Sequence, residues 1–488
     1  MVQRKDLIFI LLLLVLAYVA WQQIPQLVIR GDGFVYMVSS TLNEFFGRDY
    51  FYTGFELSAA VLGLILPALY KTNISYYFYT SLFVMMIINV FFYILLRFIT
   101  KNKVVSFFGA LIFAVNYFGN FDMYSQHCYC FFTERIVPVI FILPAFLFLH
   151  LFLEKQKIKY YFISILLYFL GIGMGHFVVL FTAPFFLYPI FWYLFKNKKI
   201  IERTKGILIG APYLMTSGFF VLIQRVHEAG LEKKVGLLEF LLNPQATQYP
   251  EKIVRQLVYW SEYEPIILNF GRASLHSYID VQSAVSITPY VVGIYILAAL
   301  ILFIKLTHMR ALLLTTIFGT LSIFYLNAWF GQYDVLNQPG ANRYLYLPTI
   351  LLVIFWTLFL WMLWKSKYRI IKILAIVLVA IYYLLNWIII SDMFRDVLFW
   401  DRSTKVTYQY MNSIRERLPK GTLVVAPYPE VGVYESMFFT EQIGNGEVEF
   451  LAEDHPYRDW VQAASASAHV VRLKYDKECD CIKEIKIK

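Results

Sequence analysis

Residues 76–99 read YYFYTSLFVMMIINVFFYILLRFI, an apolar run in which Arg97 is the only charged side chain. A helix of this length is about 36 Å long, enough to cross a hydrocarbon core of about 30 Å. Lys101 and Lys103 follow directly. This pairing of an apolar run with a basic flank recurs along the chain, and it decides the fold class.

Eleven such runs predict about 11 transmembrane helices, and therefore an α-helical polytopic membrane protein. The expected spans are 7–29, 76–99, 104–118, 136–153, 160–175, 177–195, 206–223, 287–304, 311–329, 344–364 and 370–390. The fifth and sixth are short and nearly continuous, so we expect a hairpin with His176 at its tip. The first run is longer than the 7–15 apolar residues of a signal peptide, so we expect it to stay uncleaved.

The composition excludes several other classes. Of the 488 residues, 59% are hydrophobic and 16% are charged, against about 45–50% and about 25% in an average soluble protein. A disordered chain, a collagen and a disulfide-dense secreted module are therefore excluded.

The positions of the charges predict the orientation. The net charge is +10, and 19 basic residues lie at the N-terminus and on every second connection, with only three acidic residues beside them. By the positive-inside rule these segments are cytoplasmic, so the basic balance is a topology signal and nucleic acid is not an expected partner. The apolar stretch 57–70 would reverse every later basic loop if it crossed, so we expect it to be interfacial or re-entrant.

Two domains are expected. Residues 1–391 form the transmembrane module, with large outer loops at 30–75 and 224–286. Residues 392–488 form a small extracytoplasmic α/β domain with a helix at 402–418 and strands at 422–426, 448–452, 469–475 and 482–487. The inner connections are short, so any chemistry is expected at the outer face.

The first outer loop begins Arg30-Gly31-Asp32-Gly33. An acidic residue between glycines at the membrane edge can approach a ligand closely, and ionisable groups at that depth favour a functional interpretation. Asp32 could equally cap a helix that starts near Phe34.

Other outer residues could serve a reaction that needs a base and positive charge for a phosphate leaving group. The second loop carries Asp122 and the adjacent Glu134 and Arg135; the latter two could also form a structural pair. Arg272 and Arg343 could contact phosphate oxygens through the guanidinium fork, and Arg343 could instead snorkel to the interface. Tyr344 and His176 complete the candidate substrate-binding residues. Tyr344 could also belong to the aromatic belt at the membrane interface, and His176 could simply be a polar residue at the hairpin tip.

The string Arg343-Tyr344-Leu345-Tyr346-Leu347-Pro348, together with this loop arrangement, resembles the GT-C superfamily of polytopic glycosyltransferases. That superfamily includes protein O-mannosyltransferases, aminoarabinose transferases and the membrane modules of TPR-containing mannosyltransferases. The resemblance implies a GT-C-like fold and inverting transfer from a polyprenyl-phosphate sugar, with Asp32 as the general base. Many relatives carry a second acidic residue where this chain has Gly33.

The sequence therefore predicts a multi-pass glycosyltransferase of the cell envelope, in a bacterial plasma membrane, acting on a lipid, glycan or protein acceptor. Asp122 or Glu134 would orient that acceptor or bind a divalent metal, and no other cofactor is expected. The alternatives are a polysaccharide polymerase or ligase, a lipid or polysaccharide transporter, and a non-catalytic assembly protein.

Four cysteines form two Cys-x-Cys pairs, Cys128/Cys130 and Cys479/Cys481. Both pairs are expected outside, where disulfides are permitted. Free thiols are favoured over a bridge between the pairs or a metal site with His127.

Overall fold

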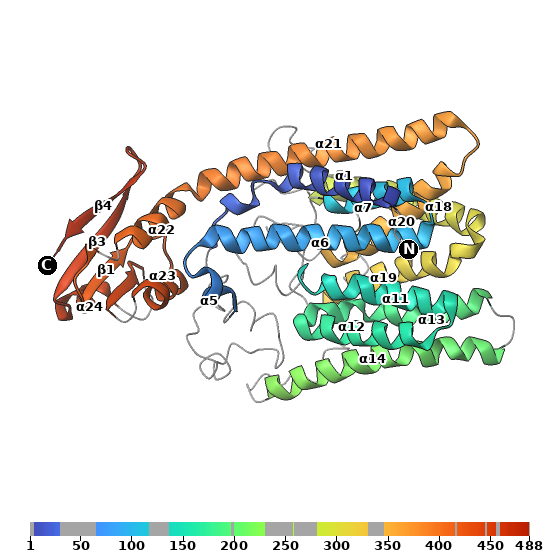
Figure 1. Ribbon diagram of the computed structural model, residues 1–488, viewed down its shortest axis with the longest axis horizontal. Helices are drawn as coiled ribbons and strands as arrows, with labels where there is room; N and C mark the ends of the chain where they lie inside the picture. The colour runs from blue at the N-terminus through green and yellow to red at the C-terminus, as the bar shows by residue number, and fades with distance from the viewer. Residues whose placement is uncertain are drawn as a thin grey trace.

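The computed structural model is a bundle of long helices with a small α/β domain at one end (Figure 1). The residues that the structure describes are 4–29, 65–116, 136–196, 200–229, 257, 281–329, 346–414, 417–444, 447–454 and 459–487. The N-terminus lies toward the end of the bundle away from the α/β domain (Figure 1).

The larger part of each of the eleven apolar runs lies in a helix. The helices are α1 (Arg4–Trp21), α6 (Ile74–Thr100), α7 (Lys103–Ala114), α11 (Val139–Lys155), α12 (Ile158–Met174), α13 (Thr182–Lys196), α14 (Ile200–Ala229), α18 (Val281–Lys305), α19 (Arg310–Trp329), α20 (Tyr346–Trp364) and α21 (Arg369–Trp400). Within the described ranges, seven helices are long and apolar enough to cross a membrane. The expectation of an α-helical polytopic membrane protein is confirmed.

Short turns of helix join or precede several of these elements. They are η1 (Ile24–Gln26), α5 (Leu66–Tyr70), η4 (His176–Phe181) and η6 (Thr307–Met309). Helices α12 and α13 are joined through η4, which begins at His176. They do not pack as the expected hairpin, because α12 packs mainly against α11 and α13 mainly against α14. Of the stretch 57–70, the structure describes only its end, where α5 is a five-residue helix.

Helix α7 is shorter than the span expected at residues 104–118. It has 12 residues and ends at Ala114, so its length is about 18 Å, shorter than a hydrocarbon core of about 30 Å. The Phe113 ring lies 4.4 Å from that of Phe92, eight residues from the end of α6. The chain therefore leaves α7 inside the bundle, where Asn116 is fully buried.

Helices α13 and α14 approach each other closely at two glycines four residues apart. A Cβ on Gly206 would lie 2.8 Å from the Ile190 Cα, and one on Gly210 would lie 2.7 Å from the Phe186 carbonyl oxygen. Small residues at this spacing let transmembrane helices pack backbone to backbone.

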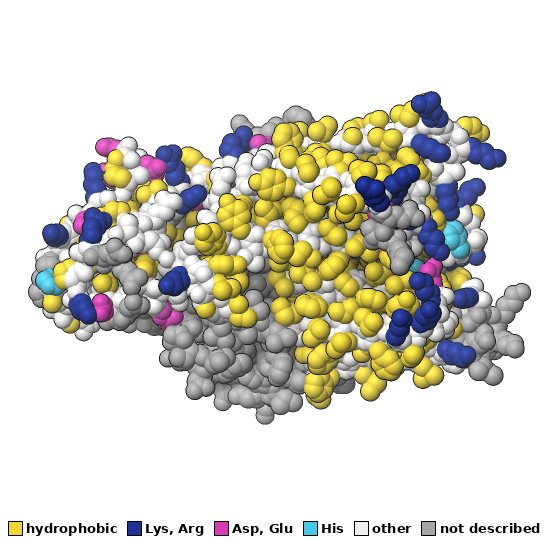
Figure 2. All heavy atoms as spheres, in the orientation of Figure 1, with side chains coloured by type: hydrophobic (Ala, Val, Ile, Leu, Met, Phe, Trp, Pro, Cys, Tyr) yellow, Lys and Arg dark blue, Asp and Glu magenta, His cyan; other side chains and the backbone are white. Residues whose placement is uncertain are grey.

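Apolar side chains cover much of the visible surface of the bundle, whereas Lys and Arg side chains gather at the end away from the α/β domain (Figure 2). On α14, Leu208 and Met215 are 70% and 72% exposed, and Tyr290 of α18 is 74% exposed. An apolar surface of this extent needs lipid around it. The basic end holds the N-terminus and the turns that join α6 to α7, α11 to α12, α18 to α19 and α20 to α21 (Figure 1).

The α/β domain follows α21, which continues without a break through residue 391 to Trp400. Helix α22 (Arg402–Ile414) is followed by β1 (Thr422–Ala426), β2 (Val448–Ala452), β3 (His469–Asp476) and β4 (Cys481–Lys486). The strand order is β2-β1-β3-β4, with β1 parallel to β2 and β3, and β4 antiparallel to β3. The four strands match the sequence expectation to within one residue at each end, and the described part of the helix ends at Ile414.

Strand β1, in the interior of the sheet, is buried on both faces, as a parallel core strand requires. On one face, Leu423, Val425 and Val470 pack with α24 (Trp460–Ala466). The other face meets α22 and α23 (Val433–Phe439), where the Phe439 ring lies 5.0 Å from Tyr408.

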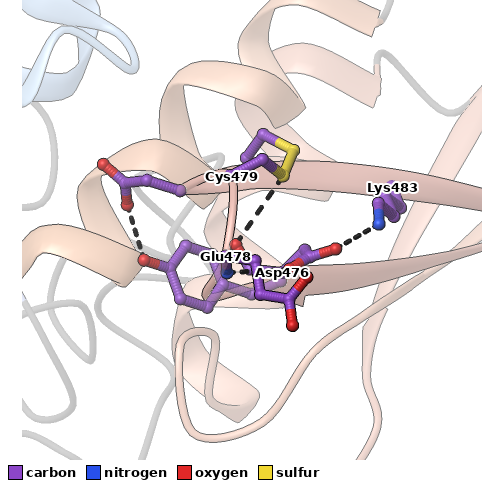
Figure 3. Close-up of a disulfide and its surroundings, with 7 residues drawn as sticks. Asp476, Glu478, Cys479 and Lys483 are labelled. Atoms are coloured by element: carbon purple, nitrogen blue, oxygen red, sulfur yellow. Dashed lines mark hydrogen bonds and ion pairs between the residues drawn. A yellow bond between two sulfur atoms is a disulfide. The ribbon is translucent and has the colours of Figure 1, made fainter.

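Cys479 and Cys481 form a disulfide in the β3–β4 turn, with their Cα atoms 5.2 Å apart. The expectation of free thiols was wrong for this pair, because the tight turn brings the two sulfurs together. The turn is held further by Asp476, which accepts a hydrogen bond from the Glu478 backbone N–H and pairs with Lys483 (Figure 3). Cys128 and Cys130 lie outside the described residues.

Candidate functional site

Seven of the eight expected site residues lie outside the described parts of the chain: Asp32, Asp122, Glu134, Arg135, Arg272, Arg343 and Tyr344. The eighth, His176, is described only as the first residue of η4. The structure describes the residues that flank these loops. The described chain segments end or begin at Ile29, Asn116, Ile136 and Tyr346.

Aromatic side chains join the end of α1 to the end of α7 and the start of α20. The Trp21 indole N–H, at the end of α1, donates a hydrogen bond of 2.7 Å to the Ala114 carbonyl at the end of α7. The Phe113 ring lies 6.0 Å from that of Tyr346, the first residue of α20. The end of α1, the end of α7 and the start of α20 therefore meet in one region of the bundle, where the second loop begins and the fifth loop ends.

Asn116 fixes the start of the second loop. It is fully buried, and its side-chain amide donates a hydrogen bond of 2.6 Å to the Tyr382 hydroxyl on α21. Irregular backbone at membrane depth is tolerated where it is buried in protein or lines a cavity. This interaction joins two segments 266 residues apart in the chain, and the sequence pattern gives no signal for it.

Tyr382 also lines an apolar groove of about 420 Å³ between α7, α18, α20 and α21. Its walls are nearly all hydrocarbon, and they include Ile112, Ile294, Tyr295 and Trp356. A second apolar cavity of about 220 Å³ lies on the other side of Tyr295, between α18, α19 and α20. The groove therefore reaches from the lipid-facing side of the bundle to the residue that holds Asn116.

The segment that follows η1, residues 27–29, is held by the α/β domain. Residues 27–29 are buried, and the Tyr408 hydroxyl of α22 donates to the Ile29 carbonyl at 3.1 Å. Beside this contact lies a polar pocket of about 350 Å³, lined by both the bundle and α22. Across it, the Thr72 hydroxyl donates to the Asn412 side-chain oxygen. The C-terminal domain thus lies against the chain segment that leads to Asp32.

A cluster of buried hydroxyls anchors the turn that contains His176. The Thr182 hydroxyl, at the start of α13, donates to the Ser217 hydroxyl of α14 at 2.6 Å, and the Tyr168 and Ser217 hydroxyls are 2.8 Å apart. The turn itself packs against α19 and α20. This cluster was not predicted from the sequence, although the hydroxyl residues on successive spans are visible there.

The described residues hold no group of three or more His, Cys, Asp or Glu side chains placed to bind a metal ion. The two carboxylates considered for that role, Asp122 and Glu134, lie outside these residues.

No protein-family model matches the sequence, and no curated protein matches it. The structure is similar to the apo form of an oligosaccharyltransferase of Archaeoglobus fulgidus, with a TM-score of 0.47 and 11% sequence identity. The match covers 93% of this chain and 65% of the other, so this chain spans less than two thirds of that protein's length. A likeness at this level supports no statement about activity or substrate.

Proposed function

We propose that this chain is a GT-C-type membrane glycosyltransferase that moves a sugar from a polyprenyl-phosphate donor to an acceptor at the extracytoplasmic face. The observation that carries the proposal is the apolar groove, which runs beside α21 to Tyr382 and hence to Asn116. A long polyprenyl tail needs an apolar path of this kind. Its phosphate would then lie near the start of the second loop and the end of the fifth.

Chain length supports the assembly of the site residues there. Asp32 lies three residues after Ile29, and Arg343 lies three residues before Tyr346, so each is within about 11 Å, Cα to Cα, of a described chain end. Glu134 and Arg135 directly precede Ile136. The Trp21–Ala114 hydrogen bond and the Phe113–Tyr346 contact bring the end of α1 beside the end of α7 and the start of α20. This proximity supports the proposal that Asp32 and the arginines act on one substrate.

Two independent features support the orientation. The basic connections lie at one end of the bundle, which the positive-inside rule makes cytoplasmic. The domain at the other end contains the Cys479–Cys481 disulfide, and disulfides persist in oxidising compartments. We therefore infer a cytoplasmic N-terminus and an extracytoplasmic domain, with the module boundary near residues 391 and 392.

In the proposed reaction, the Asp32 carboxylate takes the proton of an acceptor hydroxyl as that oxygen attacks the anomeric carbon. The bond from that carbon to the phosphate oxygen breaks, and the phosphate leaves with the electron pair. A single displacement inverts the anomeric configuration. Arg343, with Arg135 or Arg272, stabilises the negative charge on the departing phosphate.

The remaining candidates have supporting roles. Asp122 or Glu134 orients the acceptor or holds a divalent cation. Tyr344, two residues before α20 in the sequence, and His176, the first residue of η4, contact the substrate. A transporter is disfavoured because such proteins place ionisable residues near the bilayer midplane, whereas the acidic residues of the described spans lie toward the helix ends, as Asp6 and Asp392 do.

The groove is tested by measuring the binding of undecaprenyl phosphate to the full-length protein in detergent. Ile294 lines the groove and is 57% exposed, so Ile294→Trp should fit the fold and obstruct the groove. We expect its dissociation constant to rise at least about fivefold, a loss of about 1 kcal/mol. Leu297→Trp is the matched control, since Leu297 is 59% exposed on the same helix and is not among the groove-lining residues. Equal binding of undecaprenyl phosphate by the two variants would show that the groove does not hold the polyprenyl tail.

A further inference from the structure

Another polar pocket, separate from the one beside α22, lies at the basic end of the bundle. Figure 2 shows Lys and Arg side chains at this end, with a His and an acidic side chain among them. Its volume is about 650 Å³. The pocket is formed by the ends of α6, α11, α13 and α19 together with η6. The proposed glycosyltransferase site does not use it, because that site lies at the opposite ends of these helices.

The charges that line this pocket are mainly positive. Lys101, Lys155 and Lys196 contribute three ammonium groups, and Glu154 contributes the one carboxylate. Glu154 is partly neutralised already, because its Oε1 lies 3.4 Å from the Lys101 Nζ. The pocket therefore has an excess of positive charge.

Two buried polar atoms in the wall lack a hydrogen-bond partner among the described residues. They are the His150 Nε2 and the Trp192 Nε1. The His150 side chain is only 2% exposed, its Nδ1 lies 2.7 Å from the Tyr188 hydroxyl, and its Nε2 is 3.7 Å from the Glu154 carboxylate, too far for a hydrogen bond. An unpaired polar atom in such a position costs free energy unless a ligand pairs with it.

The hydrogen-bonding groups of the pocket are chiefly donors. The Trp192 N–H can only donate, as can the three ammonium groups, and a His150 ring that accepts the Tyr188 O–H at Nδ1 carries its own N–H at Nε2. Cation–π contacts fix the position of two of the ammonium groups. The Lys196 Nζ lies 5.2 Å from the Trp192 ring, and the Lys155 Nζ lies 5.7 Å from the Tyr160 ring. A cavity rich in donors and positive charge is complementary to a phosphate group.

We propose that this pocket binds a phosphate-bearing ligand at the cytoplasmic end of the protein, through Lys155, Lys196 and the buried N–H groups of Trp192 and His150. The phosphate belongs either to the headgroup of an anionic membrane lipid or to a soluble phosphate compound. Bound there, it joins α11 to α13 and satisfies the two orphaned ring nitrogens.

The test uses the full-length protein, delipidated in detergent, and native mass spectrometry with dioleoylphosphatidic acid as the probe. The double variant K155Q/K196Q removes two of the lining charges, and we expect the dissociation constant to rise about tenfold. K157Q/K372Q is the matched control, since Lys157 precedes α12, Lys372 lies in the first turn of α21, and neither lines the pocket. In the control the constant should change by less than about twofold. Equal weakening in the two double variants, or none in either, would overturn the proposal.

A third variant tests whether the lipid binds through specific hydrogen-bond donors or only through the positive charge of this end of the bundle. Trp192→Phe keeps an aromatic ring beneath Lys196 and removes only the N–H, so we expect about three- to tenfold weaker binding of the same lipid. Unchanged binding would contradict the role of the indole. Inorganic phosphate distinguishes the two ligand sources: displacement of the lipid by phosphate, reduced in K155Q/K196Q, indicates a soluble ligand, and lipid binding that resists phosphate indicates a headgroup.

Discussion

The side-chain amide of Asn116 donates a hydrogen bond to the hydroxyl of Tyr382, 2.6 Å away, and so joins the end of α7 to the middle of α21. Asn116 is fully buried, and Tyr382 also lines the apolar groove. One interaction thus connects the start of the second loop, which carries Asp122, Glu134 and Arg135, with the proposed path of the lipid donor.

Removing this hydrogen bond should loosen the end of α7. Tyr382→Phe deletes the accepting hydroxyl, and interhelical hydrogen bonds in membrane proteins contribute on average about 0.6 kcal/mol. If that loss opens the segment locally, amide hydrogen exchange in peptides covering residues 111–116 should be about threefold faster.

The neighbouring residue supplies the control. The Tyr383 hydroxyl donates to the Leu16 carbonyl of α1 at 3.2 Å, and Tyr383 is not among the groove-lining residues. Tyr383→Phe loses a comparable interaction, and exchange in residues 111–116 should remain as in the unchanged protein. Equal acceleration in the two variants would show that the Asn116–Tyr382 hydrogen bond has no particular role there.

The close contact between α13 and α14 predicts a strong effect at Gly206. A valine at this position would place its Cβ against the Ile190 backbone, 2.8 Å from the Cα, so the helices must separate. Overpacking of this kind costs about 1–3 kcal/mol, and we expect a lower midpoint of thermal unfolding in detergent. Gly218→Val tests the same substitution on the same helix, where nothing lies within 4 Å of the position that the new Cβ would take. A comparable loss at Gly218 would point to helix propensity rather than packing.

The β3–β4 turn predicts a pH dependence. The hydrogen bond from the Tyr475 hydroxyl, with a further one from Arg402, lowers the pKa of Asp480 below its usual 3.8. A carboxyl whose pKa is lower in the folded state contributes stability above the unfolded pKa, and that contribution is lost as the pH falls through the folded value. Asp480→Asn should therefore lower the unfolding midpoint of the full chain at neutral pH.

This difference should shrink only below about pH 4, where the unchanged protein becomes protonated as well. Thermal unfolding of both proteins between neutral and strongly acidic pH measures it. A difference that disappears well above pH 4 would contradict the assignment of the lowered pKa to Asp480.

The sequence predicted the elements well because each is encoded locally. Apolar length gave the spans, and a run such as Thr422–Ala426, between a Pro-Lys-Gly turn and Pro427, is typical of a buried strand. Helix α7 differed because its apolar pattern continues past Ala114 to Phe118, although the chain leaves the helix to bury Asn116 against Tyr382.

Spatial relationships between spans could not be predicted in the same way. The groove depends on α18 and α21 lying beside α20, and the basic pocket depends on four helix ends meeting around His150. Hydropathy gives the number and direction of the spans, not which helices are neighbours. The Gly206–Gly210 pair was visible in the sequence, but its partner on α13 was not. The expected catalytic residues, from Asp32 to Arg343, remain predictions.

The central claim is that this protein transfers a sugar from a polyprenyl-phosphate donor with Asp32 as the base. The most direct measurement is the release of undecaprenyl phosphate from a panel of undecaprenyl-phosphate sugars by the full-length protein in membranes, compared with Asp32→Asn. We expect the unchanged protein to release it from at least one donor. The variant should insert and bind undecaprenyl phosphate normally while its rate falls by at least about 100-fold, the usual contribution of a general base. Full activity in Asp32→Asn would contradict the account.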